Sequence, residues 1–164
     1  EYGEKGMDVE GFSGRDGRTT IFDYWSIDTL CRAEQFQLSD EERRLADMHH
    51  RLIDIAKKEK CVGEGEFFDL MYVNPASECF NPWSHYAFLR KSGRSTLLVV
   101  ANFSDNAAKV EVNIPAHAIE YLHITEGMRK ATELLTSATS SVTISKDCKL
   151  PANIPAYGVA IYKF

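Results

Sequence analysis

The sequence has no long apolar run and no basic block. No apolar stretch in its 164 residues approaches the roughly 20 residues that a membrane-spanning helix needs. Nineteen lysine and arginine residues face 24 acids, which gives a net charge of −5. This balance argues against a nucleic acid or an anionic membrane as a partner. We therefore expect a chain that binds neither.

The sequence also has no clustered cysteines. Its four cysteines lie far apart, at Cys31, Cys61, Cys79 and Cys148. They form no C-x-x-C motif, and no histidine stands at the spacing of a metal site. We expect small hydrophobic side chains or free thiols rather than disulfides, with no metal and no cofactor.

The composition is that of a globular protein. Hydrophobic residues make up 44% and charged residues 26%, which excludes wholesale disorder. The length suits one domain with a smaller appendage. Because the chain opens at EYGEKG without a methionine, we expect it to be processed or cut from a longer protein.

Residues 1–37 show no sustained hydrophobic period. They contain Gly3, Gly6, Gly11, Gly14 and Gly17, followed by the aromatic run IFDYW at residues 21–25. An irregular segment of this length is either functional or taken out of its structural context.

The stretch LSDEERRLADMHHRLIDIAKKEK predicts an amphipathic helix over residues 39–60. Ser39 and Glu42 form a capping box, in which each side chain bonds the other residue's backbone amide. Acids at the start and lysines at the end match the helix macrodipole. One apolar stripe follows the helical spacing and requires a partner: Leu45, Met48, Leu52, Ile55 and Ala56. We assign Met48, His49 and His50 to the edge of the core and the solvated face rather than to a cofactor site.

From residue 67 the hydrophobic period changes to two. Eight segments read as strands: 67–73, 85–91, 95–103, 108–114, 121–125, 131–135, 141–145 and 157–164. Short polar turns between them favour antiparallel pairing. The predicted fold is mainly β: an antiparallel β-sandwich of about eight strands, preceded by an irregular loop and one amphipathic helix.

This order of parts resembles the C-terminal end of α-amylase-type enzymes, glycoside hydrolase family 13. EYGEKGMDVEGFSGRDGRTTIFDYWS is similar to the segment that leaves the eighth strand of the family's (β/α)8 barrel. LSDEERRLADMHHRLIDIAKK is similar to the last barrel helix. FFDLMYVN, HYAFLRK, LLVVANFSD and IPAYGVAIYKF are similar to strands of the C-terminal sandwich.

The resemblance implies two parts: a remnant of the barrel at residues 1–62 and the sandwich domain at residues 63–164. It implies a parent enzyme that cleaves or transfers α-glucosidic bonds on α-glucans by a retaining mechanism. The catalytic carboxylates of such an enzyme would lie upstream of Glu1, so we expect no catalytic residue in this chain. Its partner would be the parent's own barrel, which the sandwich stabilises.

Four acids in the first loop raise the question of an acid/base pair: Asp8, Glu10, Asp16 and Asp23. Because Asp and Gly favour turns, we interpret them as turn formers. Their spacing does not match the ligand pattern of an EF-hand calcium loop.

In the complete enzyme, Arg15, Asp16 and Arg18 could contact sugar hydroxyls or brace neighbouring loops, and we favour bracing. Tyr24 and Trp25 could stack on a sugar ring. Together with Ile21 and Phe22, they resemble more closely a hydrophobic plug that seats the loop.

Trp83, in the turn-rich stretch ECFNPWSHY, is the best candidate for a glycan contact in the sandwich. The favoured alternative is a ring that covers the end of the sandwich. Asn102, Phe103 and Ser104 fit a glycosylation sequon, but read more simply as a strand that enters a turn.

A second function class stays open: a self-standing carbohydrate-binding module. It would need two or three exposed rings in a row, and the sequence alone shows no partner for Trp83. Without a barrel, we expect residues 1–37 to be mobile or to rest on another copy. An exposed apolar stripe on the helix could then drive dimerisation.

Overall fold

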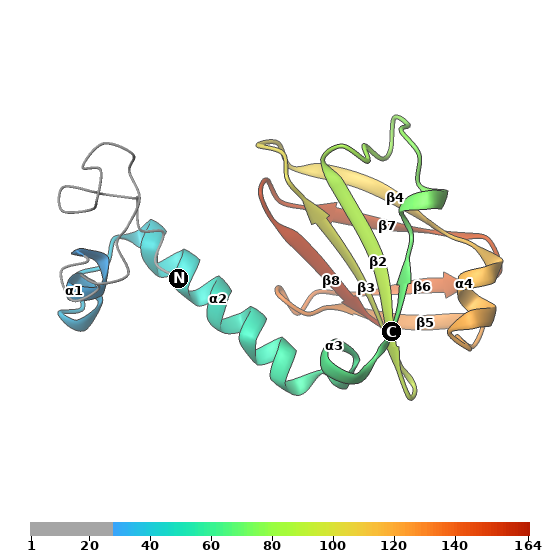
Figure 1. Ribbon diagram of the computed structural model, residues 1–164, viewed down its shortest axis with the longest axis horizontal. Helices are drawn as coiled ribbons and strands as arrows, with labels where there is room; N and C mark the ends of the chain where they lie inside the picture. The colour runs from blue at the N-terminus through green and yellow to red at the C-terminus, as the bar shows by residue number, and fades with distance from the viewer. Residues whose placement is uncertain (1–27) are drawn as a thin grey trace, which may run out of the picture. The chain divides into compact units, whose positions relative to one another are not determined.

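The computed structural model describes residues 28–164 (Figure 1). The predictions for Arg15, Asp16 and Arg18, for the four acids and for Tyr24 and Trp25 lie outside these residues. The chain divides into two compact units between Asp54 and Ile55, and each is described by itself. The predicted boundary between residues 62 and 63 stays a prediction.

The first unit contains α1 (Asp28–Glu34) and most of α2 (Asp40–Lys58). The predicted capping box is confirmed at the start of α2. The Ser39 amide donates to Glu42 Oε2 at 2.8 Å, and the Glu42 amide donates to Ser39 Oγ at 3.3 Å. The local sequence therefore sets where this helix begins.

Helix α1 corrects the prediction of an irregular segment up to residue 37. A helix of seven residues is too short to be stable by propensity alone. Its Arg32 guanidinium donates two hydrogen bonds to the Glu42 carboxylate, both 2.6 Å long. This tertiary contact, which sequence periodicity does not reveal, supports the helix.

The apolar stripe of α2 is only partly covered in the described part of the chain. Leu45 is 40% exposed, Met48 and Leu52 are half-buried, and the buried side chain of the helix is that of Ala46. The requirement for a further partner, which the sequence indicates, stays a prediction.

The second unit confirms the predicted mainly-β fold with antiparallel sheets (Figure 1). After α3 (Lys60–Glu64) the strands are β1 (Glu66–Asp69), β2 (His85–Ser92), β3 (Ser95–Asn102), β4 (Ala108–Ile114), β5 (Gly127–Glu133), β6 (Thr139–Ile144), β7 (Cys148–Ile154) and β8 (Val159–Lys163). A 3-10 turn, η2 (Met71–Val73), follows β1, and helix α4 (Ala116–Tyr121) follows β4. Among residues 28–164, no helix is long and apolar enough to cross a membrane.

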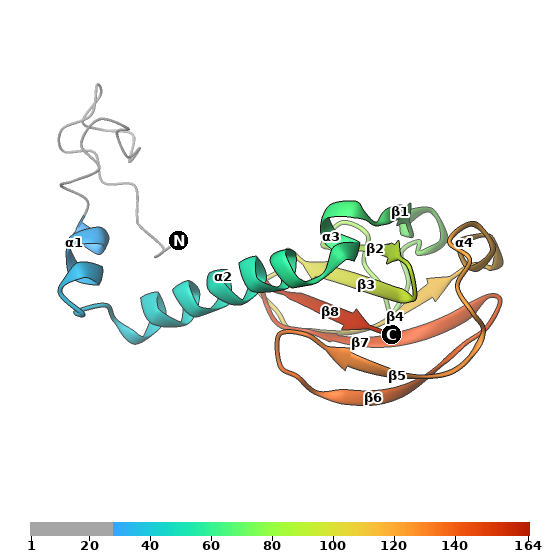
Figure 2. The same cartoon turned by 90° about the horizontal axis from the view of Figure 1, so that it is seen from below.

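The strands form one large and one small sheet. The large sheet has the order β1-β2-β3-β8-β5-β6, and the small one pairs β4 with β7. Figure 2 shows β4 and β7 on one side of β2 and β3, and α3 on the other. The core fills the space between the sheets; Leu89, Leu98, Val100, Val112, Ile114 and Ile154 are among its fully buried side chains. Their alternation along each strand is the period-two pattern of the sequence.

The strand predicted at residues 121–125 is wrong, because this stretch follows a helix. Helix α4 begins after Pro115, and the Asp147 carboxylate accepts a hydrogen bond from its first amide, that of Ala116, at 2.9 Å. Within this stretch Leu122 and Ile124 are buried at a spacing of two, which is the alternation typical of a strand.

Strand β7 was missed because Pro151 lies inside it and prolines are rare within strands. Pro151 stands opposite Glu111 of β4. The Glu111 amide donates away from β7, to the Cys79 carbonyl at 3.2 Å. Glu111 and Pro151 are therefore a pair that is not hydrogen-bonded across the two strands. The N–H that proline lacks would not have donated to β4, so Pro151 removes no hydrogen bond between the strands.

The strand predicted at residues 67–73 is interrupted after Asp69. The Asp69 carboxylate accepts a hydrogen bond from the Met71 amide at 2.7 Å, which turns the backbone into η2. The buried thiols of Cys61 and Cys148 confirm the expectation for these two cysteines.

Candidate functional site

The first candidate surface is the outer face of the large sheet, on the side away from β4 and β7. Every second residue along β2, β3 and β8 points to this face, and the following five are half-buried: Tyr86, Phe88, Val99, Ala101 and Val159. The Phe88 ring lies 5.4 Å from that of Phe67 and 5.8 Å from that of Tyr86, measured between centroids. The sandwich therefore has apolar side chains on both faces of its large sheet, whereas a sheet with one solvated face would alternate with polar residues.

Helix α3 is attached to this outer face. The Arg90 guanidinium donates to the carbonyls of Cys61 at 2.9 Å and of Val62 at 2.8 Å. The Cys61 thiol donates to the Ser95 carbonyl at 3.2 Å. An ion pair of 2.7 Å joins Lys163 of β8 to Glu59, just before α3. These contacts fix the point at which the chain enters the sandwich.

The second candidate surface is at the end of the sandwich where β2 begins, β3 ends and β8 begins. Three aromatic residues lie there, with exposed fractions of 91% for Trp83, 68% for Phe103 and 72% for Tyr157. We call these three residues the aromatic end. Because Trp83 is almost fully exposed, the favoured interpretation that its ring covers the end of the sandwich is wrong.

The loops of the aromatic end are joined by backbone hydrogen bonds. The Phe103 amide donates to the Ser84 carbonyl at 2.7 Å, and the Tyr157 amide donates to the Ser104 carbonyl at 2.9 Å. Residues next to Trp83, Phe103 and Tyr157 are thus neighbours in space although they are far apart in sequence. Sequence reasoning found Trp83 and missed the other two, whose local signal was an aromatic residue beside a turn.

Asn102, at 2% exposure, holds two of these loops together. Its side-chain amide donates to the carbonyls of Asn106 at 2.8 Å and Pro155 at 3.0 Å, and its Oδ1 accepts from the Ser104 amide at 3.0 Å. Asn102 is the last residue of β3, which confirms that the sequon is a strand end entering a turn. An asparagine buried and bonded in this way is closed to glycosylation in the folded domain.

A second hydrogen-bonded turn carries Trp83. The Trp83 amide donates to Asn81 Oδ1 at 3.1 Å, and the Asn81 amide donates to His85 Nδ1 at 3.1 Å. His85 is 8% exposed and lies edge-on to the Phe80 ring, with centroids 5.4 Å apart. Burial disfavours the charged imidazole and lowers the pKa of His85 below its ordinary value.

The buried carboxylate of Glu133 is committed to the fold. Glu133 Oε1 accepts from the amides of Ile161 at 3.0 Å and Leu135 at 3.3 Å, and Oε2 accepts from the Thr136 amide at 2.7 Å. These bonds tie the end of β5 to β8. The carboxylate therefore serves as an acceptor for backbone amides rather than as an acid or base facing a ligand.

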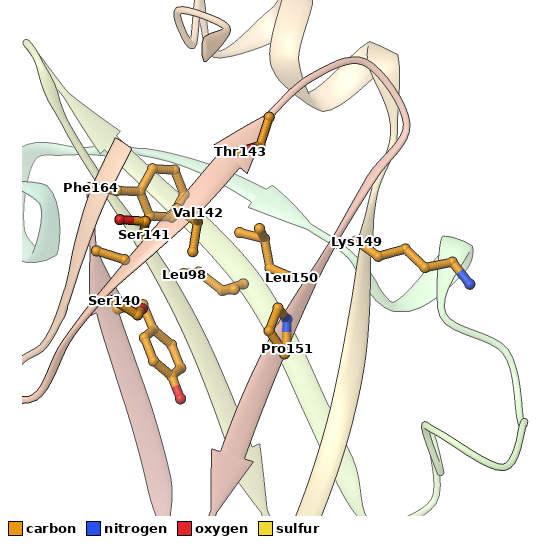
Figure 3. A pocket seen from close by; sticks show the side chains of 11 residues that line it. Leu98, Ser140, Ser141, Val142, Thr143, Lys149, Leu150, Pro151 and Phe164 are labelled. Atoms are coloured by element: carbon orange, nitrogen blue, oxygen red, sulfur yellow. The ribbon is translucent and has the colours of Figure 1, made fainter. Parts of the chain in front are cut away.

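A cavity of about 240 Å³ lies where the edges of β6 and β7 part (Figure 3). Its wall combines hydroxyl side chains of β6 with apolar ones from β3, β7 and β8: Ser140, Ser141, Thr143, Leu98, Leu150, Tyr162 and Phe164. Lys149 also borders the cavity, but in Figure 3 its side chain points away. The lining contains no carboxylate or imidazole, so it offers no acid/base pair. Among residues 28–164 no three His, Cys, Asp or Glu side chains are grouped as metal ligands.

The described second unit is thus an antiparallel β-sandwich domain with a lead-in helix on one face. Residues 81–164, just over half of the chain, match the family described as alpha amylase, C-terminal all-beta domain. The chain belongs to this family, and the resemblance to α-amylases of the glycoside hydrolases is confirmed. Among curated proteins, none matches the sequence significantly.

Solved α-amylase structures share the fold. AmyP in complex with maltose matches with a TM-score of 0.53 at 13% identity, over 90% of this chain and 24% of its own. The α-amylase from Geobacillus thermoleovorans, complexed with acarbose, matches at 0.51 and 11%, over 78% of this chain and 24% of its own. An Anoxybacillus α-amylase matches at 0.50 and 19%, over 78% of this chain and 23% of its own. The chain spans about a quarter of these structures, and likeness at such identities shows the fold alone.

Proposed function

We propose that this chain is the C-terminal part of an α-amylase-like glycoside hydrolase that acts on α-glucans. The sandwich stabilises the parent's catalytic barrel and has no catalytic residues of its own. Membership of the C-terminal family supports the parent's class. The α-glucan is inferred from the related structures, of which AmyP holds maltose.

One observation carries the stabilising role: the apolar outer face of the large sheet, to which α3 is tied. Half-buried rings such as Phe88 and Tyr86 lie on this face beside the Arg90 contacts to α3. An apolar face that the described residues cover only in part is typical of an interaction surface. Since the chain enters the sandwich over this face, a preceding barrel would lie against it.

The test compares one substitution in two settings, the 164-residue chain and the parent enzyme. Phe88→Glu places a charge on the outer face. We expect a small loss of thermal stability in the chain and a loss several degrees larger in the heat inactivation of the parent. Met128→Glu, at a residue of β5 that is 78% exposed, is the control and should change neither. Equal effects of Phe88→Glu in both settings would refute docking through this face.

The absence of catalysis is tested separately. The purified chain is incubated with soluble starch and with maltoheptaose, and new reducing ends are measured. We expect no turnover above the blank, because the described carboxylate that is buried, Glu133, is bonded to backbone amides. Turnover that co-purifies with the chain and falls in Glu133→Gln would show that it has its own chemistry.

A further inference from the structure

We propose that the aromatic end binds an α-glucan chain at a site separate from the parent's catalytic centre. Trp83, Phe103 and Tyr157 are 91%, 68% and 72% exposed and stand on neighbouring loops, and exposed aromatic side chains gathered in this way are typical of a binding surface. The choice of glucan rests on the proposed function. The existence of the surface does not, because it follows from the positions of the three rings.

The three rings stand on loops that leave three adjacent strands. In the sheet β2 pairs with β3 and β3 with β8, and the pairing reaches His85 with Asn102 and Ala101 with Val159. Figure 1 shows the three strands side by side. With strands about 4.8 Å apart, the first and third loops are separated by roughly 10 Å. A surface of this width fits an extended ligand of several units rather than one small molecule.

The chemistry of the aromatic end suits a neutral, polyhydroxylated ligand. Aromatic rings pack on the apolar faces of sugar rings. The loops at residues 74–84, 103–107 and 155–158 contain no lysine or arginine, and their charged residues are Glu78 and Asp105. An anionic ligand would therefore find no cation here. Within residues 28–164 the Trp83 indole N–H and the Tyr157 hydroxyl have no hydrogen-bond partner, so both can bond sugar hydroxyls.

The backbone under the rings is held in place before any ligand arrives. Asn102 bonds the loops at 104–106 and 155, while Asn81 and His85 hold the turn with Trp83. Tyr157 keeps a φ of 45°, a region that bulky residues rarely adopt. Binding thus orders side chains but little backbone, which lowers the entropic cost of association.

The test is native affinity electrophoresis of the 164-residue chain in gels with and without soluble starch. We expect starch to retard the unmodified chain. Trp83→Ala should abolish the retardation, and Phe103→Ala and Tyr157→Ala should each reduce it. In calorimetric titrations with maltoheptaose, the affinities of Phe103→Ala and Tyr157→Ala should be about tenfold weaker than that of the unmodified chain, as for other central aromatic contacts. The affinity of Trp83→Ala should be weaker still.

Tyr72→Ala is the matched control. Tyr72 is a tyrosine of η2 that is 62% exposed and lies outside the aromatic end, so its loss should leave retardation unchanged. Cellohexaose, a β-linked glucan, should bind more weakly than maltoheptaose. If the unmodified chain is not retarded, or if Tyr72→Ala reduces binding as much as Trp83→Ala, the proposal is wrong. Thermal unfolding of each variant shows that lost binding is not lost folding.

The competing occupant of the aromatic end is the parent's own barrel. Measurements on the parent enzyme distinguish this barrel from an α-glucan as the occupant. Under this proposal Trp83→Ala and Phe103→Ala leave the heat inactivation of the parent unchanged. The other outcome is that the two substitutions lower the inactivation temperature of the parent but not the unfolding temperature of the 164-residue chain. The rings would then belong to the domain interface, and the glucan site would be refuted. The proposed function fails independently, through the Phe88→Glu comparison and the turnover assay.

Discussion

The side chain of Asn74 pairs with the backbone of Asn113 as a neighbouring strand would. Its Nδ2 donates to the Asn113 carbonyl at 3.1 Å, and its Oδ1 accepts from the Asn113 amide at 2.8 Å. Nδ2 also donates to the Leu70 carbonyl at 2.8 Å. Asn74, at 1% exposure, therefore closes the free edge of β4 and joins it to η2.

Asn74→Leu should destabilise the sandwich by about 2 kcal/mol, because it leaves the part-buried backbone amide and carbonyl of Asn113 without their partners. Urea unfolding followed by tryptophan fluorescence measures the loss. Asn113→Ala removes one side-chain bond, from Nδ2 to the Val73 carbonyl at 3.0 Å, and should cost less than half as much. Equal costs for the two substitutions would contradict the role assigned to Asn74.

The two glycines around the end of α3 should respond in opposite directions to alanine. A Cβ on Gly65 would overlap the Cys61 carbonyl oxygen and come within 2.9 Å of its Cα, so we expect Gly65→Ala to cost about 1–3 kcal/mol. A Cβ on Gly63 meets nothing within 4 Å. Gly63→Ala, in the helix, should stabilise by about 0.5–1 kcal/mol. Thermal unfolding of both variants measures the two changes in stability. If both substitutions stabilise the domain, or both destabilise it, the prediction is contradicted.

Glu42 should titrate far below an ordinary carboxyl. Hydrogen bonds from Arg32, and next from the Ser39 amide, lower the pKa of Glu42 from 4.5 to about 2. Since the folded pKa is depressed, the stabilisation is present above pH 4.5 and is lost as the pH falls towards 2. Carboxyl carbon chemical shifts measured against pH give the midpoint. Arg32→Gln should raise it more than Ser39→Ala does, and an unchanged midpoint would exclude the Arg32 bond in solution.

His85 should make the sandwich less stable in mild acid. Its folded-state pKa lies below the ordinary 6.5 because burial disfavours the charged ring. The unfolded chain therefore takes up the proton first, so stability is complete above pH 6.5 and declines as the pH falls through the lower, folded pKa. Protonation also removes the acceptor for the Asn81 amide, which holds the turn with Trp83.

Urea midpoints at about pH 7.5 and 5.5 measure how stability depends on pH in a range where most carboxylates stay charged. In His85→Gln the amide oxygen can still accept from Asn81 but takes up no proton. We expect a flatter pH dependence in this variant. A slope equal to that of the unmodified chain would assign the effect to other groups.

Local sequence signals were sufficient for most secondary structure. Ser39 and Glu42 lie within one turn of each other, so their capping box can be read from four residues. Period-two alternation located β2, β3 and β4, because burial of one face leaves its record in every second residue. The same signal failed at residues 121–125, where Leu122 and Ile124 alternate as in a strand but follow helix α4.

Relationships between distant residues were decided by the tertiary structure. Pro151 is tolerated in β7 because the register places it opposite Glu111, whose amide donates elsewhere. The sequence shows Trp83, Phe103 and Tyr157 as three separate aromatics, and the strand order β2-β3-β8 makes them neighbours. Local pattern thus determined which segments are strands and which faces they bury. Strand order and register, which depend on hydrogen bonds between residues far apart in the chain, decided which side chains meet at a surface.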